Sequence, residues 1–198
     1  KTQAITIYIK DENDDELKFH VFQNDVLSYE DVYKCFYAYK DFKFPLNSNN
    51  KYLVVDAYKS EKIILINNIY ESKEYKFSGV KEFDKKFNYK THSIITVPLI
   101  HPIEGNVLGV VQLLNKCVDD KLVPFSTKDK ETLSMFASFI SLSIEKAQND
   151  ISKLKNLNKE LSQTNESLEK RIKKELTTNE NKSAKYFFRQ SVCHVSHK

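Results

Sequence analysis

This chain of 198 residues has no long apolar run, few glycines and no tryptophan. The longest apolar runs, such as IITVPLI at 94–100, are far too short to cross a bilayer, so we expect no transmembrane helix and no membrane partner in this fragment. With 3 glycines, no glycine-rich loop that could cradle a phosphate group is visible. The absence of tryptophan excludes no function.

Cysteine pairs are also lacking. The three cysteines, Cys35, Cys117 and Cys193, are odd in number and form no Cys-x-x-Cys pair, which predicts a protein of the reducing cytoplasm rather than a disulfide framework. The net charge of +4 is spread along the chain without a dense Lys/Arg stripe between aromatic residues, so we expect no nucleic-acid partner.

The length suits one globular domain with an appendage. Residues 1–10 have an apolar, β-branched core, and residues 17–25 alternate in polarity after the acidic turn DENDDE, which predicts a hairpin. Residues 27–47 are crowded with Tyr and Phe, and both a short helix and an irregular loop remain open. Ser48 is a candidate cap of a helix whose inner face is Leu53, Val54, Ala57 and Tyr58.

A predicted strand at 62–67 precedes the segment 68–89, which has no clean period. Long connections inside compact domains usually serve a function, so we interpret 68–89 as the lid of a ligand pocket. Polar side chains within an aromatic wall would orient a small ligand there. For each residue alone, the alternative is an ordinary core position or, for Asp84, a solvated carboxylate. The candidate lining residues are Phe77, Ser78, Phe83, Asp84, Tyr89, Thr91, Ser93 and Gln112.

Two strands are predicted at 92–101 and 107–115, and Gly109 within the second indicates a bulge or a close backbone approach. A capping-box pattern at 126–129 then opens a long helix. The apolar face of this helix thins to two rows at sevenfold spacing, uninterrupted by Gly or Pro, which predicts a parallel dimeric coiled coil. The rows are Ala147, Leu154, Leu161 and Leu168, and Ile144, Ile151, Asn158, Asn165 and Ile172.

Three motifs carry a family resemblance: VPL at 97–99, GNVLGVVQLLNK at 105–116, and PFS at 124–126 with Asp129. Over roughly residues 3–147 the chain resembles a GAF domain, a sensing module of bacterial signalling proteins. The resemblance implies an α+β fold, with an antiparallel β-sheet flanked by helices and, here, a long C-terminal coiled-coil helix. It also implies a helix before the first strand, so we expect a fragment that lacks this helix.

The expected organisation is therefore a GAF-like sensor domain at 1–147, a coiled-coil signalling helix at 148–178 and a tail at 179–198. The cyclic-nucleotide-binding GAF domains of phosphodiesterases carry a motif that Asn115, Lys116, Phe125 and Asp129 match, although Lys130 replaces its closing Glu. Two interpretations of these four residues stay open. The favoured one is a structural lock between sheet and helix, and the other is direct contact with a cyclic nucleotide or other small molecule.

The tail offers one candidate for chemistry. The sequence VSH at 195–197 resembles the start of the phosphoacceptor box of sensor histidine kinases, which makes His197 a candidate phosphoacceptor. The alternatives are a metal site using Cys193 and His194, for which no fourth ligand is near, and a disordered tail. We find no nucleophile elbow, paired-histidine zinc helix or Cys-His-Asn set, so no catalytic domain is expected within the chain.

These observations predict a cytoplasmic, small-molecule-sensing regulatory domain. The homodimeric coiled coil would relay the ligand state to an absent effector, which we expect to be the histidine kinase of a two-component system. Two alternatives remain open: a dimerisation module that binds no ligand, and a sensor attached to a nucleotide cyclase or a phosphodiesterase.

Overall fold

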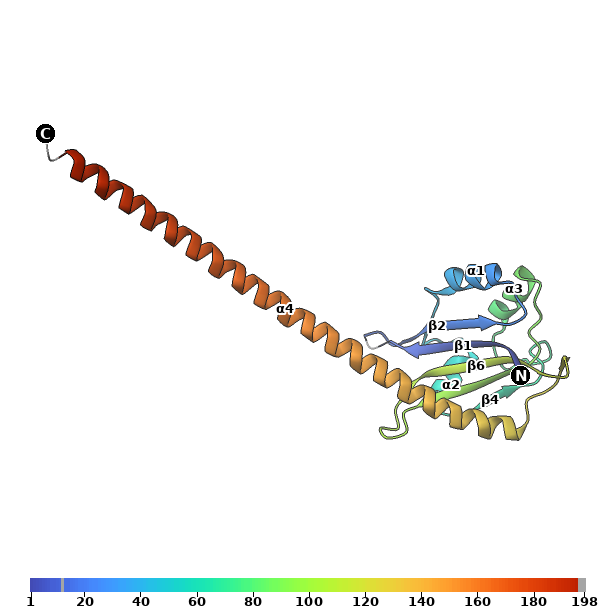
Figure 1. Ribbon diagram of the computed structural model, residues 1–198. Coiled ribbons are helices and arrows are strands. Elements are labelled where there is room, and N and C mark those ends of the chain that lie inside the picture. Colours follow the sequence, from blue (N-terminus) through green and yellow to red (C-terminus); the bar gives the residue numbers. More distant parts are fainter. Residues whose placement is uncertain (12, 196–198) are drawn as a thin grey trace. The chain divides into compact units, whose positions relative to one another are not determined.

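The computed structural model describes residues 1–11 and 13–195, with side chains placed as far as residue 179. The chain divides into two units, Lys1–Glu145 and Lys146–Lys198. The first unit is an antiparallel sheet flanked by helices, and a long helix starts within it and continues into the second unit. The expected antiparallel sheet flanked by helices and the expected long C-terminal helix are confirmed (Figure 1).

The sheet has the strand order β3-β2-β1-β6-β5-β4, with a short β7 paired to β6. All of these pairings are antiparallel. β1 and β6 are central, and each packs side chains on both faces of the sheet. The strands are β1 (Thr2–Lys10), β2 (Glu16–Asn24), β3 (Lys43–Pro45), β4 (Ile64–Ile66), β5 (Ile94–Ile100), β6 (Val107–Val118) and β7 (Lys121–Leu122).

Three short helices precede the long one: α1 (Tyr29–Tyr39), α2 (Leu53–Ser60) and α3 (Ser78–Lys86), with α4 at Thr127–Val195. Within 27–47, most residues are helical, and Ser28 Oγ caps α1 by accepting the backbone N–H of Asp31 at 3.1 Å. The expected Ser48 cap is wrong, because α2 begins only after Tyr52 and Ser48 Oγ accepts the N–H of Asn50 instead.

The segment 68–89, which has no clean sequence period, contains helix α3. Only Val80 and Phe83 within this helix turn an apolar side chain inward, so its periodicity is too weak to recognise. The expectation of an irregular segment is therefore corrected for residues 78–86, while the remainder of 68–89 consists of turns and loops.

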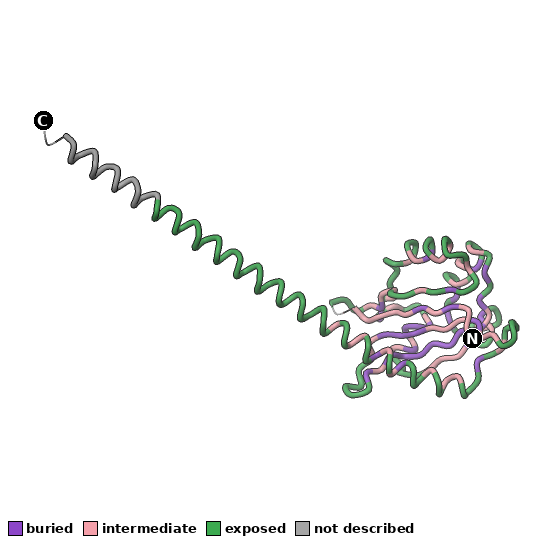
Figure 2. Tube along the Cα trace, in the orientation of Figure 1, coloured by how far each residue is buried: buried purple, intermediate pink, exposed green. Residues whose placement is uncertain are grey.

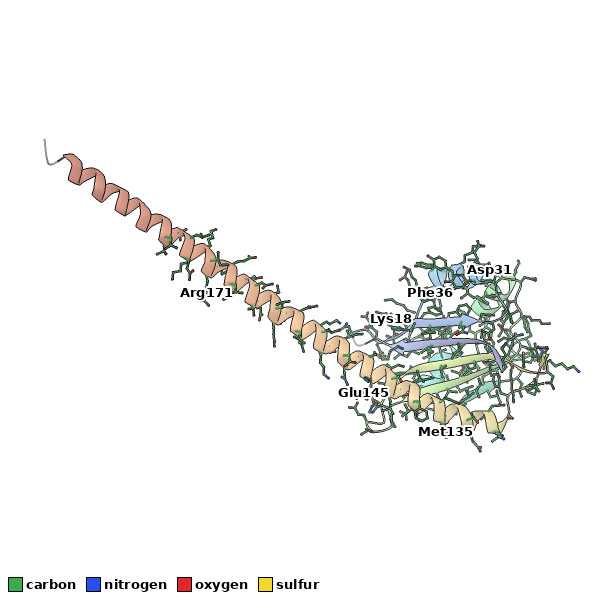
Figure 3. All side chains as sticks on the ribbon, viewed as in Figure 1. Lys18, Asp31, Phe36, Met135, Glu145 and Arg171 are labelled. Atoms are coloured by element: carbon green, nitrogen blue, oxygen red, sulfur yellow. The ribbon has the colours of Figure 1, made fainter. Side chains whose placement is uncertain are left out.

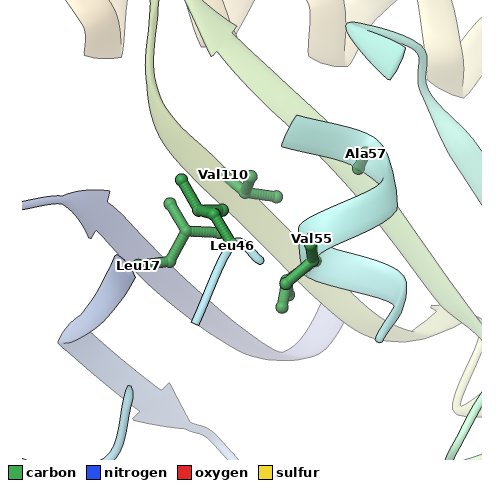
Figure 4. Packing of buried hydrophobic residues seen from close by; sticks show 6 residues of the cluster. Leu17, Leu46, Val55, Ala57 and Val110 are labelled. Carbon is green, nitrogen blue, oxygen red and sulfur yellow. The ribbon is translucent and has the colours of Figure 1, made fainter. Parts of the chain in front are cut away.

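Consecutive residues of β6 show how the two faces of the sheet are covered. Val110 packs with Leu17, Leu46, Val54, Val55 and Ala57, on the face beneath α2 (Figure 4). Val111, one residue on, points to the other face and packs with Val97, Leu99, Phe125 and Ala137 of α4. α2 and the first turns of α4 thus cover opposite faces, and the core lies in both layers.

Gly109 combines both features expected for it. A Cβ at this position would collide with the backbone carbonyl oxygen of Tyr8 on the neighbouring strand, so only glycine fits without movement. The pairing register also shifts here, since Leu99 pairs with Gly109 but Ile100 pairs with Val107, which leaves Leu108 as the extra residue of a bulge.

In the second unit, the described part of α4 is almost entirely exposed up to residue 179 (Figure 2). The exposed fraction is 52% for Ile151, 62% for Leu154 and 59% for Leu161, values far above those of core residues. Among the helices that the structure describes, none has an apolar stretch long enough to cross a membrane.

Candidate functional site

Asn115, at the end of β6, is a hub between three parts of the first unit. It is fully buried, and its φ of +55° lies in the left-handed region, which Asn adopts more readily than most residues. Its Oδ1 accepts the backbone N–H groups of His92 at 2.7 Å and Ser93 at 3.2 Å. The side chain therefore holds the loop that enters β5 against the end of β6.

The amide nitrogen of Asn115 makes three further contacts. Its Nδ2 carries two hydrogens and lies within hydrogen-bond distance of three acceptors: Gln3 Oε1 at 2.8 Å, the hydroxyl of Tyr89 at 3.1 Å and the carbonyl of Lys90 at 2.8 Å. The Tyr89 hydroxyl in turn donates to Gln3 Oε1 at 3.1 Å. Burial raises the pKa of Tyr89 to about 12, so this phenol stays protonated at physiological pH.

Asp84 of α3 forms a second polar network at the same end of the sheet. Its side chain is 4% exposed, and Oδ1 accepts the hydroxyl of Thr91 at 2.8 Å. Oδ2 accepts the backbone N–H of Thr91 at 2.9 Å and the hydroxyl of Tyr70 at 2.8 Å. Burial together with this bond raises the pKa of Tyr70 to about 12. Asp84 is therefore not a solvated carboxylate but an anchor between α3 and the loop before β5.

Aromatic rings join α3 to α1 and β2. Phe83 lies 5.9 Å from Phe22, 6.2 Å from Tyr39 and 6.0 Å from Tyr89, measured between ring centroids. These spacings are typical of favourable edge-on and tilted aromatic pairs. Phe83 and Tyr89 thus point into the interior of the first unit rather than into solvent.

The remaining candidate lining residues lie elsewhere. Phe77 is buried in a different cluster with Leu53, Ile69 and Tyr75. Ser78 is exposed at the first residue of α3, and Gln112, in the middle of β6, donates to the hydroxyl of Thr96 at 3.0 Å. The structure therefore brings together Phe83, Asp84, Tyr89, Thr91 and Ser93, and leaves three predicted residues outside this group.

Three residues of the networks carry no local signal in the sequence. Gln3 lies in the first strand, and Tyr70 and His92 lie in loops without a recognisable motif. Each becomes part of the site only because the chain brings it to Asn115 or Asp84. Among the described residues, no Lys or Arg side chain hydrogen-bonds to either network, and no cluster of three His, Cys, Asp or Glu side chains could hold a metal ion.

Asp129, in the first turn of α4, joins that helix to β6. Its Oδ2 accepts the Nζ of Lys116 at 2.6 Å and the backbone N–H of Ser126 at 2.6 Å, while Ser126 Oγ accepts the N–H of Asp129 at 3.3 Å. This reciprocal pair is a capping box. Desolvation raises the pKa of Asp129, but the bonds from Lys116 and Ser126 outweigh it and hold the pKa below its usual value. Phe125, just before the cap, is buried in the core beneath α4.

A family model described as GAF domain matches residues 2–144, which is most of the chain and nearly all of the first unit. The chain belongs to the GAF domain family. No curated protein matches it.

Solved structures show the same fold. The GAF domain of a phosphoenolpyruvate-protein phosphotransferase from Coxiella burnetii is 15% identical, with 75% of each chain covered and a TM-score of 0.54. A GAF domain/HD domain protein from Geobacter sulfurreducens is 13% identical, with 75% of this chain and 83% of that chain covered and a TM-score of 0.55. At these identities, the likeness extends to the GAF fold and not to a ligand.

Proposed function

We propose that this GAF domain is the sensory module of a cytoplasmic signalling protein. A small molecule would bind between the sheet and residues 68–89 and change how α4 packs on the sheet. The observation that carries the proposal is the dual position of α4. Its first turns belong to the core of the GAF domain, and the same helix continues as far as Val195.

A chain of direct contacts supports the relay. Asp84 of α3 binds Thr91, the loop that follows Thr91 is held by Asn115, and the next residue of β6, Lys116, pairs with Asp129 of α4. A displacement of α3 by a ligand would therefore reach the first turn of α4 through hydrogen bonds and one ion pair. These contacts provide a physical route between the ligand site and α4. Coupling itself requires that the ligand bind one packing arrangement of α4 more tightly than the other.

For the output, we propose that α4 pairs with a second copy along the rows from Ala147 to Ile172 and leads to a histidine kinase. The exposed apolar seam in the described part of α4 supports pairing. The candidate phosphoacceptor His197 lies outside the described residues, and a nucleotide cyclase or phosphodiesterase remains the alternative effector. Nothing among the described residues favours a cyclic nucleotide over another small molecule. No described Lys or Arg side chain hydrogen-bonds to either network, although the Nζ atoms of Lys81 and Lys90 lie over the ring of Tyr70.

A second candidate function is a dimerisation module that binds no ligand. Phe77 and Tyr89 are both buried, and both carboxylate oxygens of Asp84 are already bonded within the protein. A filled core of this kind favours the structural role. In that case, the GAF domain would position α4 without responding to a small molecule.

Native mass spectrometry of the full chain tests both candidates. Retained mass of a small molecule, or its appearance on titration with a panel that includes cyclic nucleotides, would support the sensor. A dimer that binds nothing in the panel would support the dimerisation module. A monomer at every concentration would refute both candidates, because both require α4 to pair with a second copy.

The assignment of the dimer to the seam is tested by Leu161→Asp. A charge in the apolar seam should convert the dimer to a monomer, whereas Gln163→Asp, two residues away on the outer face of the same helix, should leave the mass unchanged. Equal behaviour of the two variants would place the dimer contact elsewhere.

A further inference from the structure

The apolar rows of α4 begin earlier than the exposed seam. Extending the sevenfold spacing backwards from Ala147 and Ile151 reaches Ile140 and Leu133 in one row, and Ile144 and Ala137 in the other. All four of these earlier residues pack on the sheet, against residues such as Val97 and Leu99. The same helix face is therefore used twice, first by the sheet and then, according to the proposed function, by a second copy.

One helix face cannot pack against two partners at the same residue. Along these two rows, every additional residue that joins the coiled coil at its beginning must leave the sheet, starting with Ile144. The residue at which α4 stops packing on the sheet and starts pairing with the second copy is therefore set by the balance between these two packing arrangements. A contact near this residue would fix its position.

His101 makes such a contact. It is 2% exposed, directly follows β5, and its Nδ1 accepts the backbone N–H of Glu104 at 2.9 Å. Because Nδ1 is the acceptor, the proton of the neutral imidazole is on Nε2. Nε2 lies 2.7 Å from Oε2 of Glu145 and donates to it. Both ring nitrogens are thus engaged, and the imidazole joins the β5–β6 turn to α4.

Glu145 lies at the place on α4 where packing on the sheet ends. Glu145 immediately follows Ile144, the last residue of the two rows that packs on the sheet, and it is the last residue of the first unit (Figure 3). The turn that carries His101 is itself held by two backbone bonds, from His101 N–H to Asn106 at 2.8 Å and from Gly105 N–H to the carbonyl of His101 at 2.9 Å. The imidazole is therefore presented from a fixed support.

We propose that the bond between His101 and Glu145 is a latch that fixes where the apolar face of α4 passes from the sheet to a second copy of the chain. With the latch closed, Ile140 and Ile144 stay on the sheet and pairing starts at Ala147. With the latch open, the coiled coil extends toward Ile140 at the expense of helix–sheet packing. The inference rests on the proposed function, since it requires pairing along the seam, and it adds a residue pair that regulates this pairing.

Glu145→Ala opens the latch while keeping the helix, because alanine has the highest helix propensity and the Glu145 side chain is 38% exposed. The latch predicts two effects of opposite sign in the full chain. The dimer dissociation constant, measured by sedimentation, should fall by about fivefold, and the folding equilibrium of the GAF domain, followed by tyrosine fluorescence in urea, should shift about fivefold toward unfolding. A purely structural contact would produce only the second effect.

Two matched variants complete the experiment. Glu145→Gln keeps a carbonyl oxygen that can accept the His101 Nε2–H and should behave like wild type, and so should Glu166→Ala, which removes an exposed carboxylate outside the seam. An unchanged or weaker dimer in Glu145→Ala, or equal effects of Ala and Gln, would overturn the latch but leave pairing along the seam intact. A wild-type chain that stays monomeric would overturn the seam pairing and the latch together.

Discussion

Replacing Asn115 with alanine tests the hub of the polar network directly. The change removes the acceptor of two backbone N–H groups, those of His92 and Ser93, and the amide nitrogen that lies within hydrogen-bond distance of Gln3, Tyr89 and Lys90. Each buried N–H group left without a partner costs about 1–3 kcal/mol. Alanine at a left-handed φ adds about 1 kcal/mol. We therefore expect a loss of about 3–7 kcal/mol in the free energy of unfolding.

The assay is urea unfolding at neutral pH, followed by tyrosine fluorescence. This signal reports mainly the GAF domain, because the chain has no tryptophan and all of its 11 tyrosines except Tyr186 lie in the first unit. Asn88→Ala is the matched control, since Asn88 also has a positive φ, of +48°, but is exposed. This variant should lose only the backbone contribution of about 1 kcal/mol. If Asn115→Ala loses no more stability than Asn88→Ala, the hydrogen bonds of Asn115 do not stabilise the domain.

Two further predictions concern close packing and charge. Gly109→Ala should destabilise the domain by at least about 2 kcal/mol, because the new methyl group meets the carbonyl oxygen of Tyr8. Gly79→Ala is the control and should not destabilise the domain, because a Cβ at Gly79 meets no other atom. Equal unfolding midpoints of the two variants in urea would contradict this prediction. The pKa of Asp129 is lowered in the folded state, so its contribution to stability is complete above about pH 4 and is lost as the pH falls further. Asp129→Asn should therefore reduce the stability difference between pH 7 and pH 3, and an unchanged difference would show that the pair with Lys116 contributes nothing.

The family signature and the main strands could be recognised from local patterns. An apolar, β-branched core marked β1, alternation at period two marked β2, and the Gly-containing run marked β6. The pattern Ser-x-x-Asp marked the start of α4, because both partners of a capping box lie within one turn. These features depend on neighbours in the chain, so the sequence is sufficient to predict them.

Helix α3 and the true start of α2 could not be predicted in the same way. α3 has too few inward-facing apolar residues to show a period, and the N-cap residue of α2 makes no side-chain cap bond. A signal was available for α1, since Ser28 and Asp31 have capping spacing. Where a helix is held by tertiary packing rather than by its caps, local patterns place it poorly.

Three features could be recognised without the structure. The resemblance carried by short motifs implied the GAF fold, and spacing along the chain indicated the continuous helix and its apolar rows. Which polar residues meet depends on the folded chain. Gln3 and Asn115 are 112 positions apart, and His101 and Glu145 are 44 apart. The tertiary structure also decided that Asp84 is a buried anchor and that the early rows of α4 pack on the sheet. Hydrogen bonds and burial depend on distance in space, and the pairing of β1 with β6 and of β6 with β5 sets these distances across the whole domain.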